Sequence, residues 1–168
     1  MILLDSLIHL RKIVSTLLRY RYDKTTVKPP IPSGIDELVL FMEDRCVWVQ
    51  DPLWGLLDHI QPVSHMNYQL FFTIDRKIKG DCDDLASYAA WMLLRMGYQA
   101  YRINLLAHRH VICVFKDIGT GKYAWFSNQL FSGVWYRSLL DSVKGWVAAG
   151  SSGTLGPYYI EILEEDEL

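Results

Sequence analysis

The sequence predicts a single α+β domain in which an apolar helix packs on an antiparallel sheet, and three observations support this fold class. Apolar residues recur at three- and four-residue spacing from Leu85 to Met96, and Gly97 suits a left-handed helix end. Three later runs, 98–106, 110–115 and 122–128, are rich in β-branched and aromatic residues, as strands are. The chain has 168 residues, 51% of them hydrophobic, which is enough to bury a substantial core.

The order of elements in this part of the chain is helix, strand, strand, strand. The helix runs from about Asp81 to about Arg95, and the glycines of the segment 117–121 suit a hairpin between the second and third strands. Alternation in 158–163 predicts a last, half-buried strand that completes the sheet. Residues 51–79 show no clear hydrophobic period of a helix or a strand, and residues 131–146 mix aromatic and turn residues. Residues 164–167 are expected to form a solvated acidic tail.

The chain before residue 33 differs from the rest. Residues 1–27 are expected to hold an amphipathic helix, because the apolar residues of Met1–Tyr22 form one stripe. Residues 28–32, Lys-Pro-Pro-Ile-Pro, are an extended linker that ends this helix, and the domain itself occupies 33–168. Ser33 is expected to cap a second helix that runs toward Cys46.

Cys82 lies at the expected N-terminus of the apolar helix, between acidic residues. If Asp81 is the N-cap, its carboxylate accepts a hydrogen bond from the amide of Asp83 or Asp84. The unpaired amides of the first turn and the helix dipole then favour a thiolate. The negative charges of Asp83 and Asp84 disfavour this thiolate, so activation of Cys82 needs a cationic partner. Cys82 is therefore a candidate nucleophile that requires an imidazolium beside it.

His110 is the candidate partner, because it opens the predicted strand that ends at Phe115. A helix with Cys at its N-terminus, packed on an antiparallel sheet with His on a neighbouring strand, is the general arrangement of papain-like thiol enzymes.

The block from Gly80 to Ala86, Gly-Asp-Cys-Asp-Asp-Leu-Ala, followed by the strand that His110 opens, resembles the transglutaminase-like superfamily. It is most similar to the bacterial transglutaminase-like cysteine peptidases. The resemblance implies a papain-like fold, with Cys82 as nucleophile, His110 as base, and an Asp on the next strand that orients the imidazole. This chain has Ser127 where the family has that Asp.

Asn128 follows Ser127 and is an alternative third member, since an amide oxygen orients the imidazole in Cys-His-Asn sites. Adjacent strand residues face opposite sides, so Ser127 and Asn128 cannot both point at His110. Either the register shifts or the third member is weak.

The resemblance also implies an oxyanion hole made of the amide of Cys82 and a residue upstream of it. The upstream candidates are Trp54, Gln61 and Gln69, of which Gln69 is assigned. The Cys82 amide is the firmer choice, because a first-turn amide has no acceptor within its helix.

No cofactor and no metal is expected. His108 and His110 have the spacing that places two residues on one face of a strand, but no zinc or calcium motif accompanies them. Asp81, Asp83 and Asp84 together suggest a cation site, but helix capping explains at least two of them. Cys46 and Cys113 lie in apolar runs and are expected to be buried structural residues.

The amino-acid composition limits the classes of binding partner and the cellular compartment that are expected. The net charge is −2 with scattered Lys and Arg, which argues against nucleic acid. Three cysteines at irregular spacing suit a reducing compartment, and no segment has the pattern of a signal peptide or a membrane span, which favours a cytoplasmic protein with no membrane partner. The N-terminal stripe packs on the domain, on a second copy in a homo-oligomer, or on a partner chain.

The function expected from the resemblance is that of a thiol-dependent hydrolase, a cysteine peptidase or amidase. It would act on an amide bond of a peptide or protein substrate through a thioester. One alternative is a transglutaminase-type acyltransferase, with an amine in place of water. Another is a weakened or inactive peptide-binding module that uses an aromatic cleft around Trp54, Trp125 and Trp135, and a third is an assembly protein that uses the N-terminal stripe.

Overall fold

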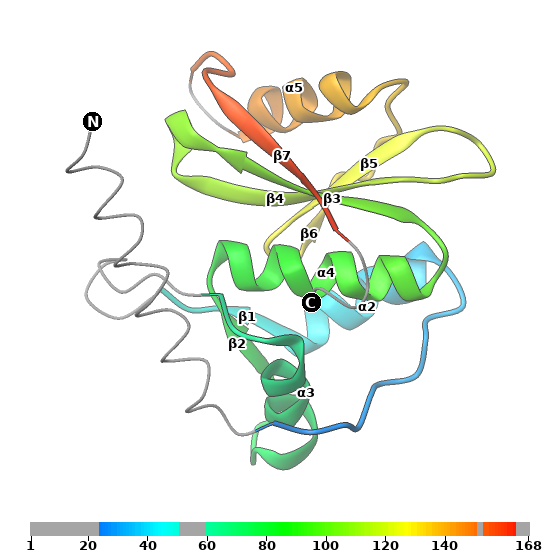
Figure 1. Ribbon diagram of the computed structural model, residues 1–168, viewed down its shortest axis with the longest axis vertical. Coiled ribbons are helices and arrows are strands. Elements are labelled where there is room, and N and C mark those ends of the chain that lie inside the picture. Colours follow the sequence, from blue (N-terminus) through cyan, green and yellow to red (C-terminus); the bar gives the residue numbers. More distant parts are fainter. Residues whose placement is uncertain (1–23, 51–59, 151–152, 164–168) are drawn as a thin grey trace.

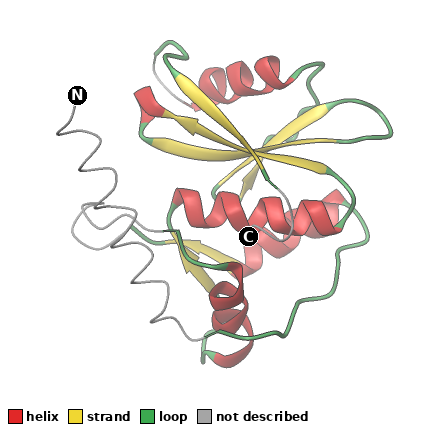
Figure 2. Ribbon diagram, viewed as in Figure 1, coloured by secondary structure: helices red, strands yellow, loops and turns green. Residues whose placement is uncertain are grey.

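A five-stranded antiparallel sheet forms the middle layer of the structure (Figures 1 and 2). The structure is a computed structural model that describes residues 24–50, 60–150 and 153–163. The strand order is β6-β5-β4-β3-β7, and every neighbouring pair is antiparallel. The strands are β3 (Gln99–Leu105), β4 (His110–Lys116), β5 (Tyr123–Ser127), β6 (Leu130–Phe131) and β7 (Tyr158–Ile162). The predicted α+β class is confirmed, and so are the four predicted strands.

Helices cover both faces of this sheet (Figure 1). On one face lie α4, α2, α3 and a small parallel pair of strands, and on the other face lies α5. The bounds are α2 (Ile35–Arg45), β1 (Cys46–Trp48), α3 (Val63–Phe72), β2 (Ile78–Gly80), α4 (Cys82–Arg95) and α5 (Leu139–Gly150). The middle strands β4 and β5 are therefore buried on both sides, whereas the edge strands β6 and β7 are partly exposed.

The structure has one hydrophobic core on each face of the sheet, and alternate side chains of β4 contribute to each of them. Cys113 and Phe115 pack with the α4 side, whereas Ile112 and Val114 pack with Trp125 and the α5 side. Successive strand residues point to opposite faces, so a strand covered on both faces reads as one continuous apolar run. His110 shares its face with Ile112, and this directs the His110 side chain toward α5.

Both ends of α4 are fixed as the sequence predicts. Asp81 is the N-cap, and its carboxylate accepts from the amides of Asp83 (3.3 Å) and Asp84 (3.4 Å). The helix ends at Arg95, and Gly97 adopts a φ of 86°, where a side chain would be strained. The first residue inside the helix is Cys82, as expected for a nucleophile at a helix N-terminus.

Two helices were not predicted from the sequence. In α3, Val63, Met66, Asn67 and Leu70 are buried at helical spacing, but no side chain caps its N-terminus. In α5, the Ser138 hydroxyl accepts from the amide of Asp141 and marks the helix start.

The N-cap predicted for α2 is wrong by one residue. Gly34 is the N-cap, and no side chain caps the helix. Ser33 instead donates from its amide (2.7 Å) and its hydroxyl (2.8 Å) to the carboxylate of Glu37. Its hydroxyl is used as a donor to an acidic side chain, which takes it away from the helix amides.

The segment 28–32 forms neither helix nor strand, as expected of an extended linker, but it packs on the domain. Pro29 and Pro32 are buried, and the Arg95 guanidinium donates to the Pro29 carbonyl at 3.1 Å. The predicted stripe of Met1–Tyr22, together with Trp54 and the acidic tail, lies outside the described residues.

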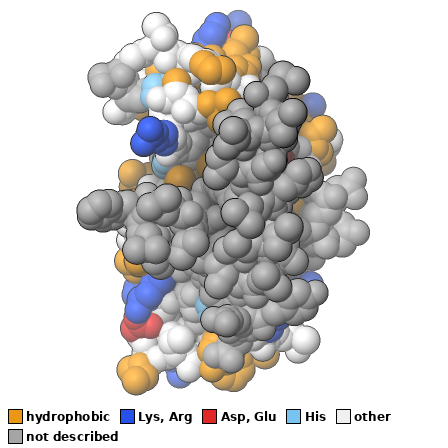
Figure 3. Space-filling view, turned by 60° about the vertical axis from the view of Figure 1, so that its left-hand side comes forward, with side chains coloured by type: hydrophobic (Ala, Val, Ile, Leu, Met, Phe, Trp, Pro, Cys, Tyr) orange, Lys and Arg blue, Asp and Glu red, His pale blue; other side chains and the backbone are white. Residues whose placement is uncertain are grey.

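Where described side chains are visible in Figure 3, the Lys and Arg side chains lie apart from one another, among hydrophobic and polar groups. Of the helices described, none combines the length and the apolar character that a membrane crossing requires.

Gly80 is expected to be essential for the start of α4. A Cβ built on it would lie 2.5 Å from the Cβ of Asp84 and 2.8 Å from Asp84 Oδ2. Replacement by Ala must push the two apart, and such overpacking costs about 1–3 kcal/mol. We therefore expect Gly80→Ala to lower the free energy of unfolding by about that amount in a urea titration. Gly150→Ala, where a Cβ meets nothing within 4 Å, is the matched control. Equal effects of the two changes would contradict this reading.

Candidate active site

Cys82 is the first residue of α4, and it is partly buried. Burial, together with the negative charges of Asp81 and Asp83, raises the pKa of the Cys82 thiol to about 11, against the backbone amides of Val111 and of Cys82 itself, which lower it. The helix terminus predicted from the sequence is present, but burial and the acids outweigh it. The resting sulfur is therefore a thiol.

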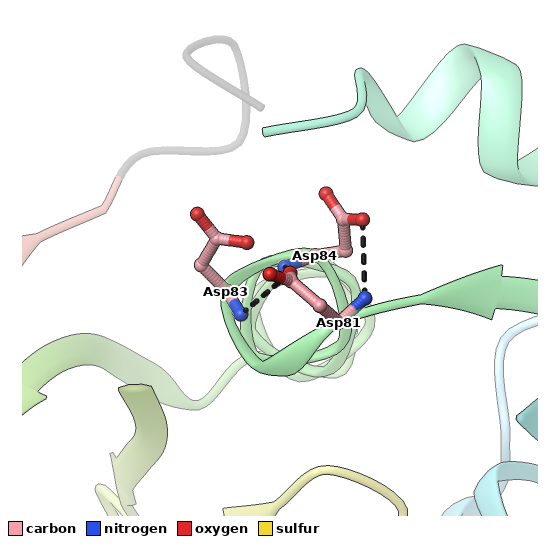
Figure 4. A group of neighbouring side chains, drawn as sticks. All are labelled: Asp81, Asp83 and Asp84. Carbon is pink, nitrogen blue, oxygen red and sulfur yellow. Dashed lines mark hydrogen bonds between the residues drawn. The ribbon is translucent and has the colours of Figure 1, made fainter. Parts of the chain in front are cut away.

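Three carboxylates gather at the first turn of α4 (Figure 4). Asp81 covers the amides of Asp83 and Asp84, and the Asp84 carboxylate reaches back to the Asp81 amide at 3.3 Å, which completes a capping box. The two acids satisfy each other's backbone, so they fix the direction in which the chain enters the helix and with it the place of Cys82.

Asp84 is fully buried and ties the helix to the upstream chain. It accepts from the Gln61 amide and from Gln61 Nε2, each at 2.6 Å. Gln69 Nε2 donates to Gln61 Oε1 at 2.9 Å, and Gln69 Oε1 accepts from the Lys79 amide at 2.6 Å. The predicted oxyanion donor Gln69 is thus engaged in this network, which holds α3 and β2 against α4, rather than with Cys82.

Asp83 has a different environment from the other two acids. Its Oδ1 is buried with no hydrogen-bond partner among the described residues. Burial raises its pKa to about 9, a hydrogen bond with Asp81 and the neighbouring charges act in the same direction, and only Arg102 opposes them. Ligand oxygens of the three acids lie within 4.8 Å of one another and are the described groups best suited to a cation. Capping occupies Asp81 and Asp84, however.

His110 is held by a hydrogen bond and by a ring stack. Its Nε2 lies 2.8 Å from Ser127 Oγ, and its ring is stacked on Trp146 at 5.1 Å between centroids and 14° between planes. Burial lowers the pKa of His110, with a smaller contribution from His108, while Asp81 raises it. In the described part of the chain no hydrogen bond joins His110 to Cys82, but the backbone amide of Val111, the residue after His110, lowers the pKa of the Cys82 thiol.

Of the two residues predicted as third member, Ser127 is the one that contacts His110. Ser127 is the last residue of β5 and reaches His110, whereas Asn128 lies beyond the strand with a φ of 53°. The Asn128 Oδ1 atom is buried and has no partner among the described residues. The left-handed turn at Asn128 ends the alternation, so Ser127 and not Asn128 shares the face of His110.

His108 does not share a strand face with His110. It belongs to a short 3₁₀ turn, Leu106–His108, and Arg109, with a φ of 47°, separates the two histidines. His108 Nε2 lies 3.2 Å from the Thr154 carbonyl oxygen, and its ring meets the edge of Trp146. The two-histidine metal pair considered from the sequence is therefore not formed on one strand.

Asn104 is a site residue that the sequence argument missed. It pairs with Val111 across the β3–β4 ladder, and Val111 packs on the α4 side. Cross-strand partners share a face, so Asn104 points toward the N-terminal end of α4, where Cys82 lies. Its Nδ2 is buried and, among the described residues, has no acceptor. A polar residue at alternate positions of an apolar strand, as at Arg102 and Asn104, is the sequence signal for it.

The aromatic cleft considered from the sequence is not a single feature. Trp125 packs in the core on the α5 side, whereas Trp135 contacts Phe115 and Phe131 of the α4-side core. The two tryptophans lie on opposite faces of the sheet, and Trp54 is outside the described residues. A pocket of about 370 Å³ is lined by residues of the proline segment, α2 and α3, and neither Cys82 nor His110 lines it.

Comparison of the chain with family models, with curated proteins and with solved structures gives no match. The functional conclusion therefore depends on the geometry around Cys82 and His110.

Asp84 should make stability depend on pH. Burial raises its pKa to about 7, whereas the carboxyl of an unfolded chain has a pKa of about 3.9. Between these values the folded protein binds more protons, so the free energy of unfolding falls as pH rises from about 4 to about 7, and Asp83 adds a slope of the same sign.

Asp84→Asn tests this. It turns an acceptor toward the Gln61 and Asp81 donors into an amide, so we expect a loss of about 1–3 kcal/mol near pH 7 and a flatter pH dependence. The measurement is urea unfolding at several pH values. Asp36→Asn, at an exposed position in the first turn of α2, is the control and should change neither quantity much. An unaltered slope in Asp84→Asn would contradict the assignment.

Proposed function

We propose that the protein is a thiol-dependent hydrolase that cleaves an amide bond of a peptide or protein substrate. The observation that carries this proposal is the arrangement at the start of β4. The backbone amide of Val111 lowers the pKa of the Cys82 thiol, which places the thiol beside the start of β4, and the adjacent His110 is held by Ser127. A thiol, an imidazole and a group that orients the imidazole are the parts that nucleophilic catalysis of acyl transfer requires.

The two nitrogens of His110 have different roles in this mechanism. Nε2 is engaged by Ser127, so the mechanism requires Nδ1 to reach the Cys82 thiol from the α5 side of β4, and the His110 ring must turn for the attack. As sulfur attacks the carbonyl carbon, Nδ1 takes the thiol proton, and it then gives that proton to the leaving amine as the thioester forms. Water, deprotonated by the same nitrogen, hydrolyses the thioester and restores the thiol.

Proton transfer accompanies the attack and does not precede it. The thiol pKa is raised to about 11 and the imidazole pKa is lowered, so both groups are neutral in the resting site. This differs from the preformed thiolate-imidazolium pair considered from the sequence, and it makes His110 a general base throughout.

The oxyanion that forms on the carbonyl oxygen needs donors on the α4 side of β4. The amide of Cys82, in the first turn of α4, is one. Asn104 Nδ2, buried and lacking an acceptor among the described residues, is the side-chain donor that this proposal assigns in place of Gln69. Preorganised donors of this kind stabilise developing charge without rearrangement.

The proposal agrees with the resemblance of Gly80–Ala86 and His110–Phe115 to transglutaminase-like cysteine peptidases and with their papain-like fold. We also propose a reducing, cytoplasmic setting, because Cys46, Cys82 and Cys113 are all unpaired. An amine in place of water would make the same site an acyltransferase.

A peptide-binding module is the second candidate, and two observations favour it. The orienting residue is a neutral Ser127, and the Cys82 thiol is held protonated. Both reduce the nucleophilicity of a resting site without affecting its ability to hold a peptide.

The acylation of Cys82 separates an enzyme from a binding module. Incubation with p-nitrophenyl acetate should release a burst of nitrophenol and leave an acetyl group on Cys82, found by peptide mass spectrometry. The rate should rise as pH passes through the lowered pKa of His110 and then stay level, because the neutral imidazole is the base. In His110→Ala the pH-independent region should disappear. The acetylation rate should then rise with the fraction of Cys82 thiolate, up to a pH of about 11.

Cys46 and Cys113 are buried and serve as internal controls for this labelling. If the rate of Cys82 acetylation and its pH dependence are the same in His110→Ala as in the unchanged protein, the basis for the hydrolase is removed and the binding module is favoured. For an active protein, a peptide library incubated with and without a fluorescent primary amine then distinguishes hydrolysis from amine transfer.

Ser127→Asp should strengthen the site. A carboxylate beside His110 Nε2 stabilises the imidazolium, so the pKa of His110 should rise by about 1–3 units and Cys82 acetylation should accelerate. Ser127→Asn, similar in size but uncharged, is the control and should give neither change. The pKa is read from the histidine ring resonances in an NMR titration, and equal behaviour of the two variants would show that charge at this position is unimportant.

A further inference from the structure

We propose that the indole of Trp146 replaces the absent carboxylate: it fixes the plane of the His110 ring and stabilises the imidazolium that forms during attack. This inference rests on the proposed function. It assigns Trp146 as a positioning residue that acts through His110, and it explains how a site with a neutral third member can still move a proton.

The geometry of the ring pair is the first step. The His110 and Trp146 rings are nearly parallel, with 14° between planes and 5.1 Å between centroids. Trp146 lies on α5, which covers the face of β4 toward which His110 is directed. The indole therefore presents its face, rather than its edge, to the imidazole.

Charge is the second step. When Cys82 Sγ–H gives its proton to His110 Nδ1, the S–H bond breaks, an N–H bond forms, and the ring becomes cationic while sulfur bonds to carbon. Ser127 can accept from Nε2–H but carries no charge to offset that of the ring. The negative face of an indole attracts a cation placed within about 6 Å of its centroid, and Trp is the best of the aromatic residues for this.

The other groups around His110 do not fill this role. Asp81 favours the imidazolium, but it caps α4 through the amides of Asp83 and Asp84. His108 disfavours a second positive charge. The His108 ring meets Trp146 edge-on at 75°, so of the two histidines only His110 lies against the indole face.

The two possible roles of Trp146 predict opposite effects of its removal on the pKa of His110, and this makes the inference testable. If Trp146 were only a cover, its loss would admit water and raise the pKa of His110 toward its ordinary value. If the indole stabilises the imidazolium, its loss lowers the pKa. The magnitude of a cation–π contact corresponds to a fall of about 0.4–1.5 units.

The experiment is an NMR titration of the His110 ring resonances in Trp146→Leu and in Trp146→Phe, with Trp135→Phe as the matched control. Trp135 packs on Phe115 and Phe131 in the opposite core and should leave the His110 pKa unchanged. We expect a lower His110 pKa in Trp146→Leu and a smaller fall in Trp146→Phe. Trp146→Phe keeps an aromatic ring in the core and provides the result if Trp146→Leu does not fold.

A His110 pKa that is unchanged or raised in both variants would overturn the inference. The same titration in a Cys82→Ala background separates it from the proposed function, because the ring pair does not require a nucleophile. A fall of the His110 pKa there supports the Trp146 assignment even if p-nitrophenyl acetate leaves Cys82 unmodified, whereas the absence of a fall overturns it even if Cys82 is acylated.

Discussion

The reciprocal capping of α4 is the constraint on which the rest of the structure depends. Asp81 covers the first amides of the helix, and the buried Asp84 returns a hydrogen bond to Asp81 while accepting two from Gln61. Gly80 is required because Asp84 packs where its Cβ would be. These contacts join β2, the segment before α3 and the central helix at one point, and they determine where Cys82 meets the sheet.

The strand β4 brings His110 to the part of the structure where Cys82 begins α4. Its first residue, His110, points toward α5, its second, Val111, points toward α4 and contacts Cys82 through its backbone, and the apolar residues that follow fill both cores. A strand with both faces buried has little freedom to slip, because a shift by one residue would exchange its two faces. The spacing of thiol and imidazole is therefore set by the same packing that holds the sheet together.

Most of the sheet and both ends of α4 follow from sequence pattern, because β-branched runs, an Asp N-cap and a terminal glycine are local signals. The helices α3 and α5 do not, since their buried positions are few and the first has no side-chain cap. At the site, Cys82 and His110 are found from their local patterns, and the choice of Ser127 over Asn128 requires the backbone turn at the strand end. Asn104 and Trp146 are placed beside the candidate site by partners distant in sequence, and Gln69 is engaged by Gln61 and Lys79, which no local pattern reveals.

The protonated state of Cys82 also bears on how the protein withstands oxidants. Peroxides react with thiolates much faster than with thiols, so susceptibility to sulfenic acid formation follows the fraction of thiolate. With the pKa of Cys82 raised to about 11 by burial and by Asp81 and Asp83, that fraction is very small at neutral pH. The acids that help to raise the pKa of Cys82 thus also help to keep its sulfur reduced, which the proposed reaction requires.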